Sequence, residues 1–406
     1  METAIPAGVK GWPPEAEGMS GAAVATAGWR VLDGTMPFPV AVLKESALAH
    51  NVALMRDYCD RHGVRLAPHG KTTMAPALFA RQLAAGAWGL TAATPVHLRL
   101  YRRLGVRRIV YANQLVEPSV IRWLASELAA DPELELYSLV DSPEAVRLLD
   151  RVLTAAAAVR PLPVLVELGM TGARTGCRTA AAALAVAREV VASDRLALAG
   201  IEAFEGLAAD VRTVDRLLDE VEAAYAAMGP MLPADAFITA GGSAYFDRVV
   251  ARFADCRLVL RSGCYVVHDT GLYARESALD GRAASGVSKS GRLRNALEVW
   301  SVVLSRPEPT LAITSMGKRD VGNDAGLPTP TLTCGAGDEH PRPLAAEVTA
   351  LNDQHAHLRV PASAPLAVGD LVGATVSHPC TTLDKWRVLA LVDDDYRVLD
   401  AVHTYF

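Results

Sequence analysis

A lysine in the segment Arg65–Pro76, RLAPHGKTTMAP, is the first residue of this chain whose neighbours suggest chemistry. Lys71 follows a short apolar run and stands beside His69, Gly70 and Thr72. Such a lysine is either an ordinary solvated charge or an amine held in a pocket for covalent chemistry with a carbonyl group. The two alternatives differ in which structural element ends at Lys71 and in what the rest of the chain brings to it.

Two glycine-containing segments offer backbone N–H groups to an anion. Gly241-Gly242-Ser243 and Gly263-Cys264 each follow an apolar run. Small side chains leave consecutive N–H groups accessible, and many phosphate-binding loops are built in this way. Gly-Gly-Ser is also the composition of ordinary turns, so both readings stay open on the motif alone.

A histidine and a cysteine near the C-terminus have the spacing of metal ligands. His378 and Cys380, in SHPCTTLDKW, are two residues apart, so on an extended segment their side chains point to one face. Imidazole and thiolate together favour zinc. Two ligands are too few for a structural zinc site, and the alternative is a buried cysteine beside a hydrogen-bonded histidine.

Short apolar runs between Val64 and Arg261 define the elements that position these residues. Eight such runs are each followed by a polar turn and an alanine-rich helical stretch: VRLAP, WGLTA, RRIVYA, LELYSLV, PVLVEL, LAGIEAF, DAFITA and RLVLR. This alternation predicts an α/β fold in which parallel strands and right-handed crossovers form a (β/α)8 TIM-type barrel. Active sites of such barrels lie where the strands run into the following loops, which is where Lys71 and the glycine segments occur.

The pattern differs on both sides of the barrel. Phe38–Leu43 predicts a strand, and a helix is predicted from its cap Ser46 to His62, before Gly63. After about residue 286, β-branched runs appear: LEVWSVVLS, TLAITSM, HLRV, DLVGATVS, WRVLALV and RVLDAVHTY. We predict a lead-in over residues 1–43 whose strand joins the β domain, the barrel over 44–285 and a C-terminal all-β domain over 286–406.

Composition excludes several classes of partner. The 406 residues are 51% hydrophobic and 21% charged, with a net charge of −5 and no Lys/Arg-rich run, so neither nucleic acid nor an anionic membrane is expected as a partner. The N-terminus lacks the apolar core of a signal peptide, and no apolar stretch is long enough to span a bilayer. The six cysteines are scattered without CxxC spacing. We therefore expect a cytoplasmic protein with free thiols.

Taken in order, these motifs resemble those of the fold-type III pyridoxal phosphate enzymes, in particular the D-serine dehydratase and D-threonine aldolase group related to alanine racemase. PHGKT resembles the Pro-His-x-Lys-Thr whose lysine holds the cofactor, ELGMTGARTG the Gly-x-x-Arg-x-Gly turn, and GGSAYFD the phosphate loop. RSGCYVVHD resembles Arg-Pro-Gly-x-Tyr-x-x-x-Asp, and SHPCTTLDKW the His-x-Cys metal site of the dehydratases. The resemblance runs from about Phe38 to the C-terminus.

The resemblance implies a set of roles. Lys71 would bind pyridoxal 5′-phosphate as a Schiff base and act in catalysis, and a divalent metal, Zn²⁺ with Mn²⁺ or Mg²⁺ as alternatives, would bind His378 and Cys380. His355 either orients the metal-bound groups as a catalytic residue or is a surface polar residue. A homodimer with sites at the subunit interface is also implied. Cofactor contacts are expected from Lys71, Gln114, Arg174, Glu205, Gly241, Gly242, Ser243, Gly263, Cys264 and Tyr265.

The implied activity is that of a lyase on a small D-β-hydroxy amino acid, which would be dehydrated to a 2-oxo acid and ammonia. Retro-aldol cleavage to glycine and an aldehyde is the alternative, and Cys380, where the aldolases usually carry aspartate, favours dehydration. A racemase fits less well because it needs a second base and no metal. A non-catalytic pyridoxal-binding regulatory protein would keep Lys71 but have no use for the His378–Cys380 pair. Lys71-Thr72-Thr73-Met74 departs from the family's Lys-Thr-His-Lys, which puts the substrate side-chain contacts in doubt.

Overall fold

The computed structural model describes residues 3–282, 291–335 and 337–406. The chain forms two compact units. One, called here the barrel unit, comprises Arg56–Lys71 and Gln82–Gly263; the other, the β unit, comprises Met1–Met55, Thr72–Arg81 and Cys264–Phe406. The boundary predicted between residues 285 and 286 lies outside the described residues. None of the helices in the described ranges is long and apolar enough to cross a membrane.

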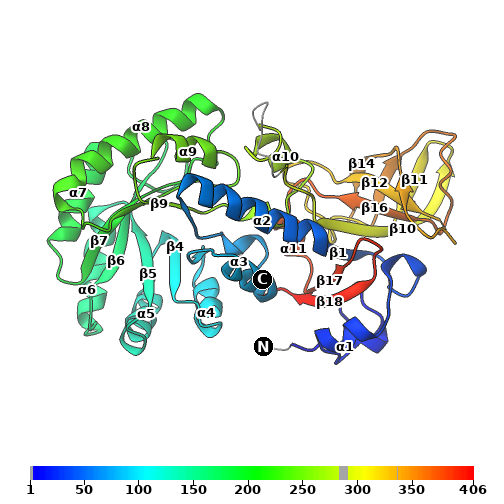
Figure 1. Ribbon diagram of the computed structural model, residues 1–406, viewed down its shortest axis with the longest axis horizontal. Helices are drawn as coiled ribbons and strands as arrows, with labels where there is room; N and C mark the ends of the chain where they lie inside the picture. Colours follow the sequence, from blue (N-terminus) through cyan, green and yellow to red (C-terminus); the bar gives the residue numbers. More distant parts are fainter. Residues whose placement is uncertain (1–2, 283–290, 336) are drawn as a thin grey trace. The chain divides into compact units, whose positions relative to one another are not determined.

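The barrel unit contains eight parallel strands (Figure 1). They lie in the order β2-β9-β8-β7-β6-β5-β4-β3. A parallel bridge between His69 and Thr91 connects the two ends of this order, so the sheet closes on itself. The predicted (β/α)8 architecture is therefore confirmed. The strands are β2 Arg65–Leu66, β3 Leu90–Ala92, β4 Arg108–Gln114, β5 Glu135–Val140, β6 Leu162–Leu168, β7 Leu196–Ala203, β8 Phe237–Thr239 and β9 Leu258–Leu260.

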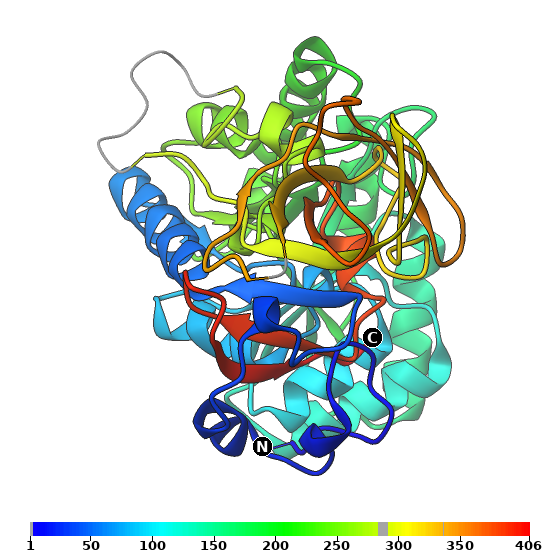
Figure 2. The same cartoon turned by 90° about the vertical axis from the view of Figure 1, so that its right-hand side faces the viewer.

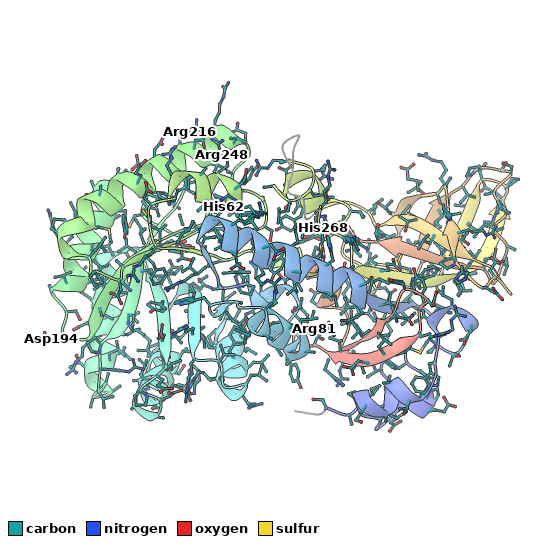
Figure 3. The ribbon with its side chains drawn as sticks, in the orientation of Figure 1. His62, Arg81, Asp194, Arg216, Arg248 and His268 are labelled. Carbon is teal, nitrogen blue, oxygen red and sulfur yellow. The ribbon has the colours of Figure 1, made fainter. Side chains whose placement is uncertain are left out.

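Helices follow the strands and lie outside the sheet, as α5 to α8 show in Figure 1. Thr94, Ser142, Thr179 and Asp210 each accept a hydrogen bond from an N–H of the first turn, which is worth about 1 kcal/mol per cap. Arg248 (Figure 3) pairs with Asp215 at 2.7 Å and thereby ties α9 to α8. The helices are α2 Glu45–His62, α3 Pro76–Ala84, α4 Pro95–Arg103, α5 Pro118–Ala130, α6 Pro143–Ala155, α7 Ala180–Val191, α8 Val211–Met228 and α9 Phe246–Arg252.

Apolar side chains fill the inside of the barrel. Trp88 precedes β3 and Phe237 begins β8, and their rings lie 5.8 Å apart. Tyr137 packs edge-on against Phe237 at 5.0 Å. Burying a side chain of this size stabilises the fold by roughly 1.5–3 kcal/mol. Because these rings fill the end of the barrel where the strands begin, we expect a site at the opposite end, where the strands finish. The buried cluster consists of Ala67, Val110, Leu139, Leu165, Phe237 and Val259.

The β unit is built on a ten-stranded sheet (Figure 2). The strand predicted over Phe38–Leu43 is β1, Val40–Lys44, which pairs with β10 antiparallel and β17 parallel. The other strands of this sheet form the all-β architecture that was predicted. Two short helices, α10 Leu272–Glu276 and α11 Cys380–Leu383, also belong to the β unit. The strands are β10 Leu297–Glu308, β11 Leu311–Thr314, β12 Thr329–Cys334, β13 Arg342–Pro343, β14 Glu347–Leu351, β15 Ala356–Arg359, β16 Leu371–Thr375, β17 Val388–Val392 and β18 Val398–His403.

The N-terminal lead-in covers one face of this sheet. Helix α1, Gly21–Thr26, lies beside β18 (Figure 2), and Trp12 and Val24 belong to one buried cluster with Val388 and Val398. The Trp12 indole donates to the Val388 carbonyl at 3.2 Å. The lead-in is therefore part of the core of the β unit.

Candidate active site

A cavity of about 170 Å³ opens where the barrel strands end. Each of the eight strands, or the loop after it, contributes to its wall. The end of the barrel at which the active site was predicted therefore contains a cavity with polar lining residues. The contributing residues, in strand order, are His69, Ala93, Ala112, Leu139, Glu167, Glu202, Gly242 and Arg261, and Lys71 and Arg174 complete the rim.

Lys71 belongs to a short 3-10 turn, Gly70–Thr72, that follows β2. Its side chain is exposed and lines the cavity. Burial, followed by the positive charges of Lys71 and Arg261, lowers the pKa of the neighbouring His69 well below its ordinary value. His69 is therefore neutral near pH 7, and its buried Nδ1 has no hydrogen-bond partner among the described residues.

A buried ion pair lies opposite. Arg261 donates to Glu202, and also to the Thr239 hydroxyl at 3.0 Å and the Ala203 carbonyl at 3.1 Å. Burial raises the pKa of Glu202 to about 8, while the Arg261 guanidinium acts in the opposite direction. Removing both charges from water costs several kcal/mol per ion, so such a pair is weak support for stability and typical of a functional site.

Glu167, at the end of β6, is a second buried acid. It accepts hydrogen bonds from the Gln114 amide and, at 2.7 Å, from the Thr175 hydroxyl. Burial raises its pKa. Gln114 Oε1 and Glu202 Oε2 are buried without a partner among the described residues, as is His69 Nδ1. Buried polar atoms are nearly always hydrogen-bonded, so these three atoms can accept the polar groups of a ligand or ordered water.

The loop after β6 holds Arg174 at the rim. The Gly176 N–H donates to Asp141 at 3.0 Å, and a Cβ on Gly176, whose φ is +101°, would lie 2.5 Å from the Gly169 nitrogen. Only glycine therefore fits at position 176. Arg174 itself is exposed, with its guanidinium 4.7 Å from the centre of the Phe204 ring.

Glu205 fixes the predicted phosphate loop. Its fully buried carboxylate accepts from the Gly241 N–H at 3.1 Å and the Gly242 N–H at 2.6 Å. The Ser262 hydroxyl donates to the Gly242 carbonyl at 2.8 Å, and the Gly263 N–H donates to the Ser243 hydroxyl at 3.3 Å. Glu205 thus shapes the loop from behind, an arrangement that its sequence position did not indicate.

In the β unit, a thiol–imidazole cluster brings together the predicted metal ligands His378 and Cys380 with Cys264. Their ligand atoms lie within 4.8 Å of one another, and the two sulfurs are 3.5 Å apart. His378 Nδ1 contacts Asp324 at 2.7 Å. A carboxylate on one imidazole nitrogen fixes the ring so that the other nitrogen faces a metal. Two thiols and an imidazole form a donor set that suits zinc.

The remaining predicted residues lie elsewhere. Tyr265 is buried in the short turn Cys264–Val266. His355 is exposed in the turn between β14 and β15, where its carbonyl accepts from the Asn352 N–H at 2.9 Å, and it is outside the thiol–imidazole cluster. The Nε2 atom of the buried His268 (Figure 3) contacts Asp280 at 2.8 Å within the β unit, and its Nδ1 has no hydrogen-bond partner among the described residues.

Sequence reasoning missed several residues of these two sites. Arg261 begins the motif RSGCYVVHD, but no role was predicted for it. Glu167 is the one acid within the apolar run PVLVEL, and this position was an available signal. Two residues that contact His378 are far from it in the chain, Asp324 by 54 residues and Tyr273 by 105. The Tyr273 ring lies 6.2 Å from that of His378. Neither residue belongs to a local sequence motif.

Family comparisons agree with both units. A family model described as "Alanine racemase, N-terminal domain" matches residues 43–266, more than half of the chain, and one described as "Putative serine dehydratase domain" matches residues 296–392. A D-threonine aldolase from Arthrobacter sp. is 28% identical over 366 residues, covering 88% of this chain and 89% of that protein.

Solved structures show the same fold. A D-threonine aldolase from Filomicrobium marinum superposes with a TM-score of 0.75 at 22% identity, over 91% of this chain and 95% of that one. A D-threo-3-hydroxyaspartate dehydratase from Delftia sp. HT23 gives 0.72 at 21% identity, over 91% and 98%. In sequence, that dehydratase is 37% identical over 78 residues, 19% of this chain and 20% of its own length.

The barrel match covers the lysine, the glycine loops and the cavity together, and pyridoxal phosphate and a divalent metal both suit the residues that the two units present. The chain therefore belongs to the alanine racemase N-terminal domain family, the fold-type III pyridoxal phosphate enzymes, and within it stands with the lyases.

Proposed function

We propose that this protein is a metal-assisted lyase that converts a small D-β-hydroxy amino acid to a 2-oxo acid and ammonia. The observation that carries the proposal is the pairing of His378 and Cys380 with Asp324 behind the imidazole. A lysine and phosphate loops suit pyridoxal enzymes in general, whereas a metal-ligand pair suits a reaction in which the β-oxygen of the substrate must be polarised, either to leave or to lose its proton.

Lys71 would hold the cofactor between turnovers and, as the free amine, take the proton from Cα. When bound, pyridoxal phosphate supplies an electron sink at Cα and the metal supplies a Lewis acid for the β-oxygen. The Arg261–Glu202 pair and Glu167 with Gln114 would present fixed polar groups to the cofactor, and the loop held by Glu205 would receive its phosphate.

Zinc is the metal we propose, with His378 and Cys380 as ligands. Thiolate and imidazole prefer zinc to manganese or magnesium, which favour oxygen ligands. Asp324 also accepts from the Thr381 hydroxyl, so its carboxylate is itself held in position behind His378. Thr72, which contacts Cys380 Sγ at 3.6 Å, directly follows Lys71 in the chain.

Retro-aldol cleavage to glycine and an aldehyde is the second candidate. It is supported by the D-threonine aldolase that matches 88% of this chain, whereas the dehydratase match in sequence is confined to 78 residues. Dehydration is supported by the thiol ligand. Solved structures named D-threo-3-hydroxyaspartate dehydratase include alanine variants of a histidine and of a cysteine two residues later, the latter described as metal-free.

The test is a panel of D- and L-serine, threonine and threo-3-hydroxyaspartate, assayed separately for oxo acid, ammonia, glycine and aldehyde. We expect oxo acid and ammonia in equal amounts from a D isomer, and loss of both with Lys71→Ala. Lys318→Ala, at an exposed position, is the control.

Borohydride reduction and peptide mapping should place the pyridoxyl group on Lys71. Glycine and aldehyde in place of oxo acid would identify an aldolase, and an adduct on Lys318 would refute the site.

A homodimer and a role for His355 are part of the proposal through the resemblance to fold-type III enzymes. Sedimentation equilibrium of the holoenzyme should give twice the 43.0 kDa chain mass, and a 43.0 kDa species would contradict the homodimer.

His355→Ala should lower turnover without releasing metal, because His355 is not among the three clustered ligand residues.

A further inference from the structure

Cys264 differs from the other cofactor-loop residues in what its side chain contacts. Its sulfur lies 3.5 Å from Cys380 Sγ and 3.7 Å from the Thr72 hydroxyl, while the Thr72 hydroxyl lies 3.6 Å from Cys380 Sγ. The Cys264 side chain therefore points toward the predicted metal ligands. It is buried, and no disulfide joins it to Cys380.

The distances suit a shared metal ion. Two thiolates at about 2.3 Å from a tetrahedral zinc are roughly 3.8 Å apart, and a thiolate and an imidazole nitrogen are about 3.5 Å apart. The observed sulfur separation of 3.5 Å is close to the first value, and the three ligand atoms all lie within 4.8 Å of one another. Small side-chain rotations would be enough to bring the three atoms onto one ion.

Neighbouring side chains hold the three possible ligands in position. Asp324 contacts His378 Nδ1, which leaves Nε2 for the metal. The Tyr273 ring packs edge-on against His378 at 6.2 Å, and Thr72 is buried beside both sulfurs. Every one of these residues belongs to the β unit. The site is thus a built constellation with oriented ligands, and more than a chance pair of thiols.

We propose that Cys264 is a third protein ligand of the metal, so that the site is Cys2His with one position left open for a substrate oxygen. This inference rests on the proposed function, which supplies the metal. Two thiolates neutralise the charge of a divalent ion, and they strengthen the preference for zinc over manganese and magnesium. Three protein ligands and an open position are the usual composition of a catalytic zinc site.

Cobalt substitution tests the ligand count without an activity assay. Co²⁺ bound to the reduced protein gives a near-ultraviolet thiolate charge-transfer band whose intensity scales with the number of sulfur ligands. We expect Cys264→Ser to halve this band and to weaken Co²⁺ binding by more than about 100-fold, the upper range for losing an outer-shell partner. Cys256→Ser, at a half-buried cysteine of the barrel unit, is the matched control and should leave the band unchanged.

X-ray absorption of the unsubstituted zinc enzyme provides a second measurement that no folding defect can confound. Two sulfurs at about 2.3 Å support the proposal. One sulfur, or an equal band in the wild type and Cys264→Ser, overturns the role of Cys264 while leaving a His378–Cys380 metal and the proposed lyase intact. No stoichiometric metal in the wild type overturns both.

Discussion

Glu205 determines which atoms of the glycine loop are left for a phosphate. Its carboxylate takes the N–H groups of Gly241 and Gly242, and these hydrogen bonds hold the backbone in a shape that needs glycine. Gly241 has a φ of +85°, and a Cβ at Gly242 would lie 2.8 Å from the Phe204 ring. An acid behind the loop therefore sets its form, and a phosphate bound by this loop, as we propose, would have to use N–H groups further along it.

Gly242→Val is expected to impair cofactor binding. The added side chain would press on Phe204 and on Glu205 Oε1, 3.3 Å from the new Cβ, at a cost of about 1–3 kcal/mol. That corresponds to a roughly 5- to 150-fold loss of pyridoxal phosphate affinity if the cost falls on the bound loop, measured by cofactor absorbance during dilution.

Gly229→Val is the matched control. A Cβ at Gly229 has nothing within 4 Å and its φ is negative, so cofactor retention should match the wild type. Equal retention in both variants would mean that the 241–243 loop does not approach the cofactor.

At the level of single residues, the sequence predicted which positions would line the cavity better than it predicted their contacts. Lys71 could be placed at the cavity because it follows an apolar run beside small residues, a local signal. The direction of the Cys264 side chain could not be found, because it depends on Cys380, 116 residues later. The same is true of Glu205, which lies 36 residues before its partner Gly241.

His97, at the start of helix α4, has a structural role that depends on its neutral form. Thr94 caps the helix by accepting from the His97 N–H at 3.4 Å, and His97 Nδ1 accepts from the Ala93 N–H at 3.2 Å. Burial, and then the positive charge of Lys71, lowers the pKa of His97 from 6.5 to about 4. The neutral ring is therefore part of the junction between β3 and α4.

Acid should weaken this junction. The folded pKa of His97 is below its unfolded value, so the unfolded chain binds more protons between pH 6.5 and about 4, and stability falls as pH decreases through that window. His97→Asn, whose amide oxygen can still accept from Ala93, should lose less stability between pH 7 and pH 5 than the wild type. Denaturant midpoints at both pH values measure this. Parallel losses would show that folding does not lower the pKa of His97.

Element types could be predicted and element ends less well. The eight apolar runs became the eight barrel strands, because a repeated strand–helix pattern has few alternative folds. Helix α2 ends at His62 before Gly63, as expected, but begins at Glu45, and the predicted cap Ser46 donates instead to Asp394 at 2.7 Å. Strands β12 to β14 had no prediction, since a Pro330-containing run and exposed edges give weak alternation.

Across the whole molecule, the two ligand sites belong to different compact units. The lining of the cavity proposed for the cofactor lies in the barrel unit, and the thiol–imidazole cluster lies in the β unit. The chain passes between the units at four places, and two of these are Lys71–Thr72 and Gly263–Cys264. Residues of the two sites are therefore consecutive in sequence, and one short motif contributes to both.

Removing each ligand should consequently loosen a different unit. A ligand present at 100 times its dissociation constant stabilises the native state by about 2.7 kcal/mol, which slows hydrogen exchange through openings that break its site by about 100-fold. Chelation should accelerate exchange in residues 320–326 and 376–386 of the β unit. Removing the cofactor with a carbonyl reagent should accelerate it in residues 167–176 and 241–243 of the barrel unit. Cys380→Ser and Lys71→Ala should reproduce the two patterns in turn. If chelation loosened the barrel loops as strongly as its own segments, the metal would not be held within the β unit, and the assignment of His378, Cys380 and Cys264 as its ligands would fail.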